Sequence, residues 1–304
     1  MLPLQRLHAI LALASVVLMR LGVADAATTP MHKVLLTQRG YIQFLRWEMP
    51  LPEIREFTYC LWMKSVNYTL RNSIFSYSHN ETQRRVSAWV SAYGQSVHLE
   101  IGSVEVMAVP VNLQEHRWYH LCQSWDSRDG QFALWIDAHV VAHGYAKQMA
   151  GHVIPANGDP VVGQEYTDFD KGLEEGIEGA VLGFNLLLVS AFAPRSRSIL
   201  RSASSYTPFG FVYAPKYFTS NFYNWPTSKN RGRQVVRKVE SDPLIPGETI
   251  GEYLVRMTYE HCQRGRASPF INPTVMIISW TRTPVKIFGG AVVKNALGTC
   301  GHFG

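Results

Sequence analysis

Apolar and polar residues alternate along much of the chain between residues 33 and 188. Every second residue is apolar within residues 57–63, 97–101 and 132–136, which is the pattern of strands that bury one face. Segments rich in Ser, Asn, Asp and Gly separate these runs, and such residues favour turns. The alternation predicts an all-β fold in which two antiparallel sheets pack as a sandwich.

The pattern changes towards the C-terminal end of the chain. Residues 194–205 are expected to form one short helix, because a proline stands at the first position and an Ile-Leu pair supplies an apolar contact. Residues 242–247 have the composition of a linker, and residues 253–257 and 274–280 are expected strands. We therefore predict that residues 243–304 are a C-terminal extension of unknown fold, separate from the sandwich.

The first residues have the composition of a signal peptide. An apolar run over residues 9–19 is followed by Ala24-Asp-Ala26, a small-x-small cleavage sequence. The run is about 11 residues long, whereas a membrane span needs about 18 or more. We expect residues 1–26 to be removed on export, so that the protein is secreted to the extracellular space. No later segment has the length and hydropathy expected of a transmembrane helix.

Sequons and cysteines fit an exported chain. Two Asn-X-Thr sequons, at Asn67 and Asn80, are candidate glycosylation sites, because N-glycosylation takes place in the secretory pathway. The four cysteines include no Cys-x-x-Cys pair, which argues against zinc ribbons and thioredoxin-like redox chemistry. Disulfides are the default state of cysteines in an oxidising compartment.

Charge is distributed unevenly around a formal net charge of +6. Residues 195–238 contain nine Lys or Arg and no acidic residue, whereas residues 165–178 contain six acidic residues and one lysine. The basic stretch favours an anionic partner, such as an anionic glycan or a lipid headgroup. It is equally compatible with a solvated surface, or with pairing to the acidic segment of a second copy in a homo-oligomer. Export disfavours nucleic acid as the partner.

The residues around the second cysteine carry a family resemblance. Residues 120–127, His-Leu-Cys-Gln-Ser-Trp-Asp-Ser, resemble the pentraxin signature at all five positions that the signature specifies. Further segments resemble the family in the same order along the chain: residues 57–61, 73–77, 134–137, 162–165 and 221–225. The resemblance implies a pentraxin-like jelly-roll sandwich of the concanavalin and laminin-G type over residues 27–242. It also implies a lectin-like recognition protein rather than an enzyme.

The resemblance implies which cysteines pair. Cys60 lies where the family has the disulfide partner of Cys122, and a bond between them encloses about 63 residues, worth about 4 kcal/mol in the chain-entropy model. Pairing of Cys262 with Cys300 would then leave no thiol unused. The other interpretation of His120 and Cys122, a thiol nucleophile and its base, is disfavoured because a disulfide-bonded cysteine offers no thiolate.

Pentraxins of the C-reactive protein type bind ligands through a pair of calcium ions held by two loops. In the loop that follows the family's Gly-Gln-Glu motif, Glu165 stands at a ligand position and Tyr166 offers its backbone carbonyl. The family's next aspartate is Thr167 in this chain, with Asp168 displaced by one place. Glu174 only approximates the spacing of a further ligand.

The other calcium loop of the family contributes an Asp-Asn pair, but Gln83 and Arg84 stand at these positions. An arginine cannot bind a cation, and each lost carboxylate removes charge that a hard cation needs. Calcium is therefore a doubtful cofactor. The acidic residues 165–178 have three interpretations: a solvated acidic loop, a catalytic group, or a weakened single calcium site that uses Glu165, Asp168, Asp170 or Glu174.

Three classes of function remain after these observations. The leading hypothesis is a secreted recognition protein for an anionic glycan, a lipid headgroup or an extracellular protein, with weakened or absent calcium dependence. The second is an extracellular structural or matrix protein that uses the sandwich as a scaffold. The third is a jelly-roll glycoside hydrolase, but the carboxylates at residues 165, 168 and 170 do not have the Glu-x-Asp-x-x-Glu spacing of such enzymes.

Overall fold

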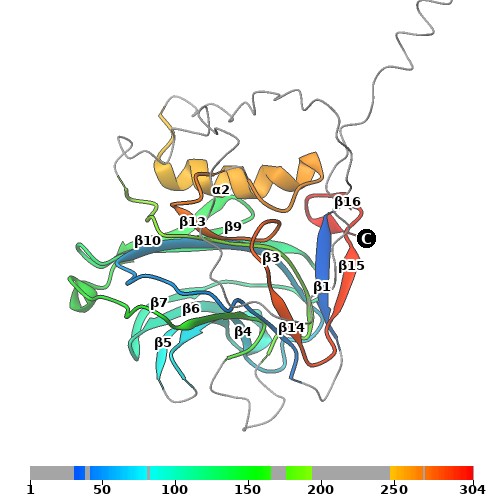
Figure 1. Cartoon of the computed structure of the whole chain (residues 1–304), viewed down its shortest axis with the longest axis horizontal. Coiled ribbons are helices and arrows are strands. Elements are labelled where there is room, and N and C mark those ends of the chain that lie inside the picture. Colours follow the sequence, from blue (N-terminus) through cyan, green and yellow to red (C-terminus); the bar gives the residue numbers. More distant parts are fainter. Residues whose placement is uncertain are drawn as a thin grey trace, which may run out of the picture.

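The computed structural model describes residues 31–37, 42–80, 83–165, 176–193, 247–269 and 271–303. Two antiparallel sheets pack face to face around one large apolar core (Figure 1). The described residues contain one α-helix, α2 (Ile250–Glu260), which lies on the outer side of one sheet (Figure 1). The expected all-β sandwich with one short helix is confirmed.

Within the described ranges, sheet A has eight strands and sheet B has seven. Along sheet A the order is β10 (His139–Tyr145), β9 (Gln131–Ile136), β8 (Tyr119–Asp126), β3 (Glu56–Ser65), β12 (Gly179–Leu187), β1 (His32–Leu36) and β15 (Val292–Asn295), with β13 (Met276–Ser279) also paired to β12. Along sheet B the order is β14 (Lys286–Phe288), β2 (Phe44–Arg46), β11 (Asp159–Val162), β4 (Asn72–Ser78), β5 (Arg84–Val90), β6 (Ser96–Ile101) and β7 (Val104–Pro110). The remaining elements are the hairpin of β16 (Gly298–Thr299) and β17 (His302–Phe303), and the 3-10 turns η1 (Ala92–Gly94), η2 (Lys147–Met149) and η5 (His261–Arg264).

The alternation of the sequence explains the core. On β3, the side chains of Phe57, Tyr59, Leu61 and Met63 all point between the sheets and are at most 1% exposed. The β6 residues of the same pattern, within 97–101, close the core from sheet B. The opposite face of β3 is also covered, because α2 and the C-terminal hairpin pack against the outer side of sheet A. Sheet A is therefore buried on both faces near β3.

Residues 253–257 were expected to form a strand, but they lie inside α2. Thr249 caps this helix: its side chain accepts a hydrogen bond from the backbone N–H of Glu252 at 3.1 Å, and the Glu252 carboxylate accepts one from the N–H of Thr249 at 2.8 Å. This capping box, followed by buried Ile250, Leu254 and Met257 at helical spacing, favours the helix over the strand. The helix expected at residues 194–205 lies outside the described residues.

The C-terminal region differs from the separate extension that we expected. Three of its strands belong to the sandwich: β13 pairs with β12 and β15 with β1 in sheet A, while β14 pairs with β2 in sheet B. Ile278 of β13 is fully buried in the main core. The described part of residues 243–304 is thus continuous with both sheets, which the short apolar runs of this region did not reveal. The boundary placed at residue 242 lies outside the described residues.

Candidate functional site

Glu165 lies on the outer face of sheet B, directly after β11. Its carboxylate is 1% exposed and forms ion pairs with two arginines: Arg84 at 2.9 Å and Arg71 at 3.0 Å. The hydroxyl of Ser87 donates a further hydrogen bond to the same carboxylate at 2.7 Å. The two guanidinium groups are partly exposed, at 31% for Arg84 and 26% for Arg71. Glu165 is therefore a buried anion neutralised by cations that belong to the chain itself.

A stack of flat side chains extends from this ion pair across sheet B. The guanidinium of Arg71 lies 4.2 Å from the centroid of the Trp89 ring, a cation–π contact. The imidazole of His98 lies on the other side of Trp89, with the ring centroids 4.8 Å apart and the planes 4° from parallel. Glu105 and Ser96 hold the two ring nitrogens of His98, at 2.8 Å and 2.7 Å. Both faces of Trp89 are thus covered by the protein's own side chains.

An open pocket of about 440 Å³ is lined by Arg84, the partner of Glu165. Its lining residues are Gln83, Arg84, Arg85, Glu100 and Ser103. Within it, the guanidinium of Arg85 donates to the side-chain oxygen of Gln83 at 3.0 Å. The pocket therefore brings two arginines next to one carboxylate, an arrangement suited to polar and charged ligands rather than apolar ones.

The described part of the proposed calcium loops does not fit a divalent cation. Calcium needs about six to eight oxygen ligands, yet both oxygens of Glu165 already accept hydrogen bonds or ion pairs from arginines. The guanidinium of Arg84 lies against the carboxylate that a cation would bind. The other predicted ligands, Tyr166, Asp168 and Glu174, lie outside the described residues. The sequence identified Arg84 as an obstacle, but it missed Arg71, which is 94 positions from Glu165 in the chain.

The signature residues His120 and Cys122 have a structural role. The structure pairs Cys60 with Cys122 and Cys262 with Cys300, as expected. Cys60, His120 and Cys122 bring their side-chain ligand atoms within 4.8 Å of one another, but disulfide sulfurs are not thiolates and do not bind zinc. Burial lowers the pKa of His120 to about 3, so this side chain is a neutral core residue at neutral pH.

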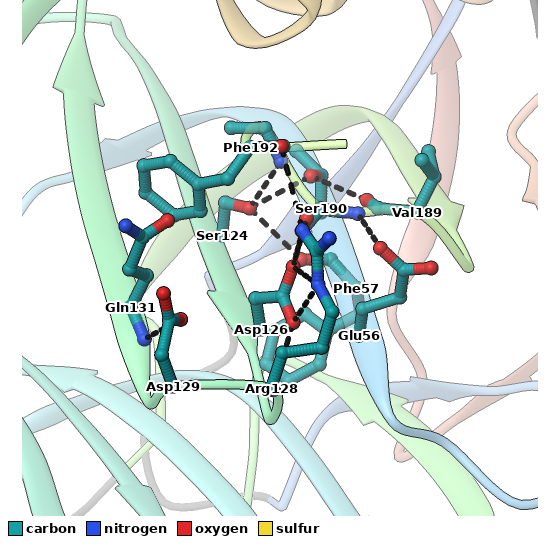
Figure 2. Close-up of polar contacts among 12 residues, drawn as sticks. Glu56, Phe57, Ser124, Asp126, Arg128, Asp129, Gln131, Val189, Ser190 and Phe192 are labelled. Atoms are coloured by element: carbon teal, nitrogen blue, oxygen red, sulfur yellow. Dashed lines mark hydrogen bonds and ion pairs between the residues drawn. The ribbon is translucent and has the colours of Figure 1, made fainter. Parts of the chain in front are cut away.

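The end of the signature strand forms a rigid polar corner (Figure 2). The buried carboxylate of Asp126 accepts hydrogen bonds from Arg128 and from the hydroxyl of Ser190, both at 2.7 Å. Ser124 donates to the carbonyl of Phe57 at 3.1 Å. Burial raises the pKa of Asp126, but the hydrogen bonds from Arg128 and Ser190 outweigh burial and hold this pKa below its usual value. The corner joins β8 to the chain after β12.

The two sequons differ in their surroundings. The side-chain amide of Asn67 donates to the carboxylate of Glu178 at 2.8 Å, and its oxygen accepts from the hydroxyl of Thr69 at 2.7 Å. Asn80 is exposed, and its side-chain oxygen accepts from the backbone N–H of Gln83 at 2.9 Å. Asn80 is thus the more exposed of the two sequon asparagines.

Sequence comparisons show that the central part of the chain is similar to one family. The pentaxin family model matches residues 38–180. Pentraxin-related protein PTX3 of Bos taurus is 31% identical over 142 residues, which cover 44% of this chain and 36% of that protein. The neuronal pentraxin receptor of Homo sapiens is 27% identical over 157 residues, covering 51% of this chain and 31% of the receptor. The chain therefore spans about a third of the length of these relatives.

A solved structure shows the same fold over most of the chain. The native heptameric SAP-like pentraxin of Limulus polyphemus superposes with a TM-score of 0.54 and 17% sequence identity, covering 88% of this chain and 95% of the other. Among the described residues, no helix is both long and apolar enough to cross a membrane. The described chain has the jelly-roll sandwich of the pentraxins, and residues 38–180 match the family model of the pentaxin domain.

Proposed function

We propose that this chain is a secreted, non-enzymatic recognition protein whose ligand binding does not depend on calcium. Its ligands would be anionic glycans, lipid headgroups or extracellular proteins. The observation that carries the proposal is the pair of guanidinium groups on Glu165. The match of residues 38–180 to the pentaxin family model supports recognition as the general role.

The arginines supply the charge that a metal ion would otherwise bring. An arginine remains protonated at any pH at which the protein folds, and it binds carboxylates through directed N–H donors. A divalent ion that entered the site would have to displace Arg84 from a carboxylate that is 1% exposed. Displacement leaves the guanidinium without this partner and dehydrates the ion, so both steps oppose metal binding.

The same geometry argues against catalysis by Glu165. A general acid or base in a glycosidase must reach the scissile bond and exchange a proton with it. Glu165 is buried, and both of its carboxylate oxygens are in contact with Arg71 or Arg84. Glu165, the candidate carboxylate that the structure describes, is therefore unsuited to be the catalytic group of a glycoside hydrolase.

Calcium is expected to leave the thermal stability of the mature protein unchanged, because Arg71 and Arg84 already supply the positive charge next to Glu165. The variant Arg84→Asn with Gln83→Asp and Thr167→Asp restores the ligand types of the family. We expect calcium at about a hundred times its Kd to stabilise this variant by about 2.7 kcal/mol. The measurement is a thermal unfolding curve in calcium and in chelator.

A matched control replaces the neighbouring arginine. Arg85 contacts Gln83 rather than Glu165, so Arg85→Asn with Gln83→Asp and Thr167→Asp should remain insensitive to calcium. The proposal is wrong if calcium stabilises the unaltered protein, or if the control responds as strongly as the Arg84 variant.

We also propose that Asn80 carries the N-linked glycan of the secreted protein. Asn80 is exposed, whereas the amide nitrogen of Asn67 is hydrogen-bonded to Glu178. Asn80→Gln should abolish the mobility shift that a glycosidase produces on secreted material, while Asn67→Gln should retain it. Retention of the shift in Asn80→Gln, with loss in Asn67→Gln, would reverse the assignment.

Self-association is a further part of the proposed function. Strands β10 and β15 are at the two ends of the sheet A order. They carry five of the eight large apolar side chains that are exposed among the described residues: Val140, Val141, Tyr145, Val292 and Val293. Edge strands with apolar side chains pair readily with another chain. Two different edges of one sheet can join in head-to-tail contacts, which close into a ring when the rotation allows.

A further inference from the structure

Three lysines from three strands of sheet A lie together on its outer face, on the other side of the sandwich from Glu165. Lys33 of β1 is directly opposite Lys294 of β15 in the antiparallel register. Leu35, Ala180 and Lys64 form one row across β1, β12 and β3. Because residues two apart on a strand share a face, Lys33 lies on the same side as this row. The register thus places Lys33, Lys64 and Lys294 on one face of neighbouring strands.

Two of these lysines, Lys33 and Lys64, contact an apolar cluster that contains Trp118 and Phe303. The ammonium of Lys64 lies 5.5 Å from the centroid of the Trp118 ring. Lys33 is 8% exposed, and its ammonium donates to the carbonyl of Phe303 at 3.5 Å. Phe303 in turn packs edge-on against Trp118, with the centroids 5.0 Å apart. The charges therefore stand at the rim of an apolar cluster, where water screens them less than on an open surface.

The three positive charges repel one another, and at Lys64 and Lys294 no carboxylate of the described residues balances the charge. Within the part of the chain that the structure describes, neither Lys64 nor Lys294 forms an ion pair with a carboxylate. Like charges directly opposite each other on paired strands are destabilising. Burial lowers the pKa of Lys33, and the charges of Lys64 and Lys294 lower it further. The charges of Lys64 and Lys294 thus act on Lys33, the lysine between the apolar cluster and the neighbouring strand.

We propose that Lys33, Lys64 and Lys294 form a binding site for a sulfate or phosphate group. Ammonium groups act as compact charges with three donors each, and a tetrahedral oxyanion can accept from several of them at once. The bound anion would relieve the repulsion among the lysines. This inference rests on the anion-binding part of the proposed function, but it places the anion on sheet A, away from Arg84 and Glu165.

The test uses the mature full-length chain with inorganic sulfate and inorganic phosphate as probes, measured by calorimetric titration. We expect Lys64→Gln and Lys294→Gln each to weaken binding by about fivefold, the effect of one partly exposed charge. Lys147→Gln is the matched control, because Lys147 is exposed on η2 and lies outside the lysine cluster. It removes the same charge and should leave the affinity unchanged. Both cluster variants keep Lys33, which avoids a buried substitution.

The source of the oxyanion is resolved by two further probes. Binding of a sulfated disaccharide would assign the site to glycan sulfates, and binding of vesicles that contain phosphatidylserine would assign it to lipid phosphates. The proposal is overturned if neither inorganic anion binds, or if Lys147→Gln weakens binding as much as Lys64→Gln. The Arg84 variant separates the two proposals: it should bind sulfate or phosphate normally, whatever its response to calcium.

Discussion

Replacing both Cys60 and Cys122 with alanine is expected to lower the free energy of unfolding by about 4–5 kcal/mol. The two cysteines are 62 positions apart, and the chain-entropy model assigns about 4 kcal/mol to closing a loop of this length. The bond also lies between β3 and β8 with both cysteines fully buried, against Val255 of α2. Removing the sulfurs therefore adds a packing loss. Urea unfolding measures the effect as a lower midpoint, and the m-value should rise because the unfolded chain without the cross-link exposes more surface.

The second disulfide provides the control. Cys262 and Cys300 are 38 positions apart, so the chain-entropy estimates for the two loops differ by only about 0.4 kcal/mol. Cys300 is partly exposed, and its bond holds the terminal hairpin rather than the centre of sheet A. We expect the Cys262→Ala, Cys300→Ala protein to lose at least 1 kcal/mol less than the first variant. Equal losses would show that packing around Cys60 and Cys122 adds nothing.

The alternation of apolar and polar residues predicts the strands well where one face of the strand is buried. It fails at residues 253–257, which belong to helix α2. Residues 57–63 and 97–101 are strands because a period of two places all their large apolar side chains in the core. The apolar residues within 253–257 are too few to distinguish a strand from a helix by periodicity. The deciding feature is the capping box formed by Thr249 and Glu252, which is visible in the sequence but lies outside the apolar run.

The candidate site was predictable only in part. The resemblance placed Glu165 and Arg84 in two loops that meet, and the structure joins them at 2.9 Å. Arg71 and Trp89 could not be assigned from the sequence, because their contacts depend on the pairing of β4 with β5 and on how the chain leaves β11. The lysine cluster has the same origin: Lys33 and Lys294 are far apart in the chain and become neighbours only when β15 pairs with β1.

Stability is expected to fall steeply as the pH drops below about 6.5, because His120 must stay neutral in the folded protein. Burial lowers the pKa of His120 to about 3, whereas an unfolded histidine has a pKa of about 6.5. The unfolded chain therefore binds a proton that the folded chain excludes. The stability tied to His120 is fully present above pH 6.5 and is lost as the pH falls towards 3, at about 1.4 kcal/mol per pH unit.

His120→Phe removes this titration and keeps an aromatic ring beside Trp62 and Tyr259, whose ring centroids lie 5.1 Å and 5.4 Å from that of His120. Between pH 6.5 and 4.5 the unaltered protein should lose about 2 kcal/mol more than this variant, measured by urea unfolding at each pH. Asp126 also contributes stability that is lost on acidification, because its pKa is lowered in the folded protein. This loss occurs at more acidic pH and is common to both proteins. His143, exposed on β10, supplies the control: His143→Gln should retain the full pH dependence. If His120→Phe keeps the slope of the unaltered protein over this range, another histidine is responsible for it.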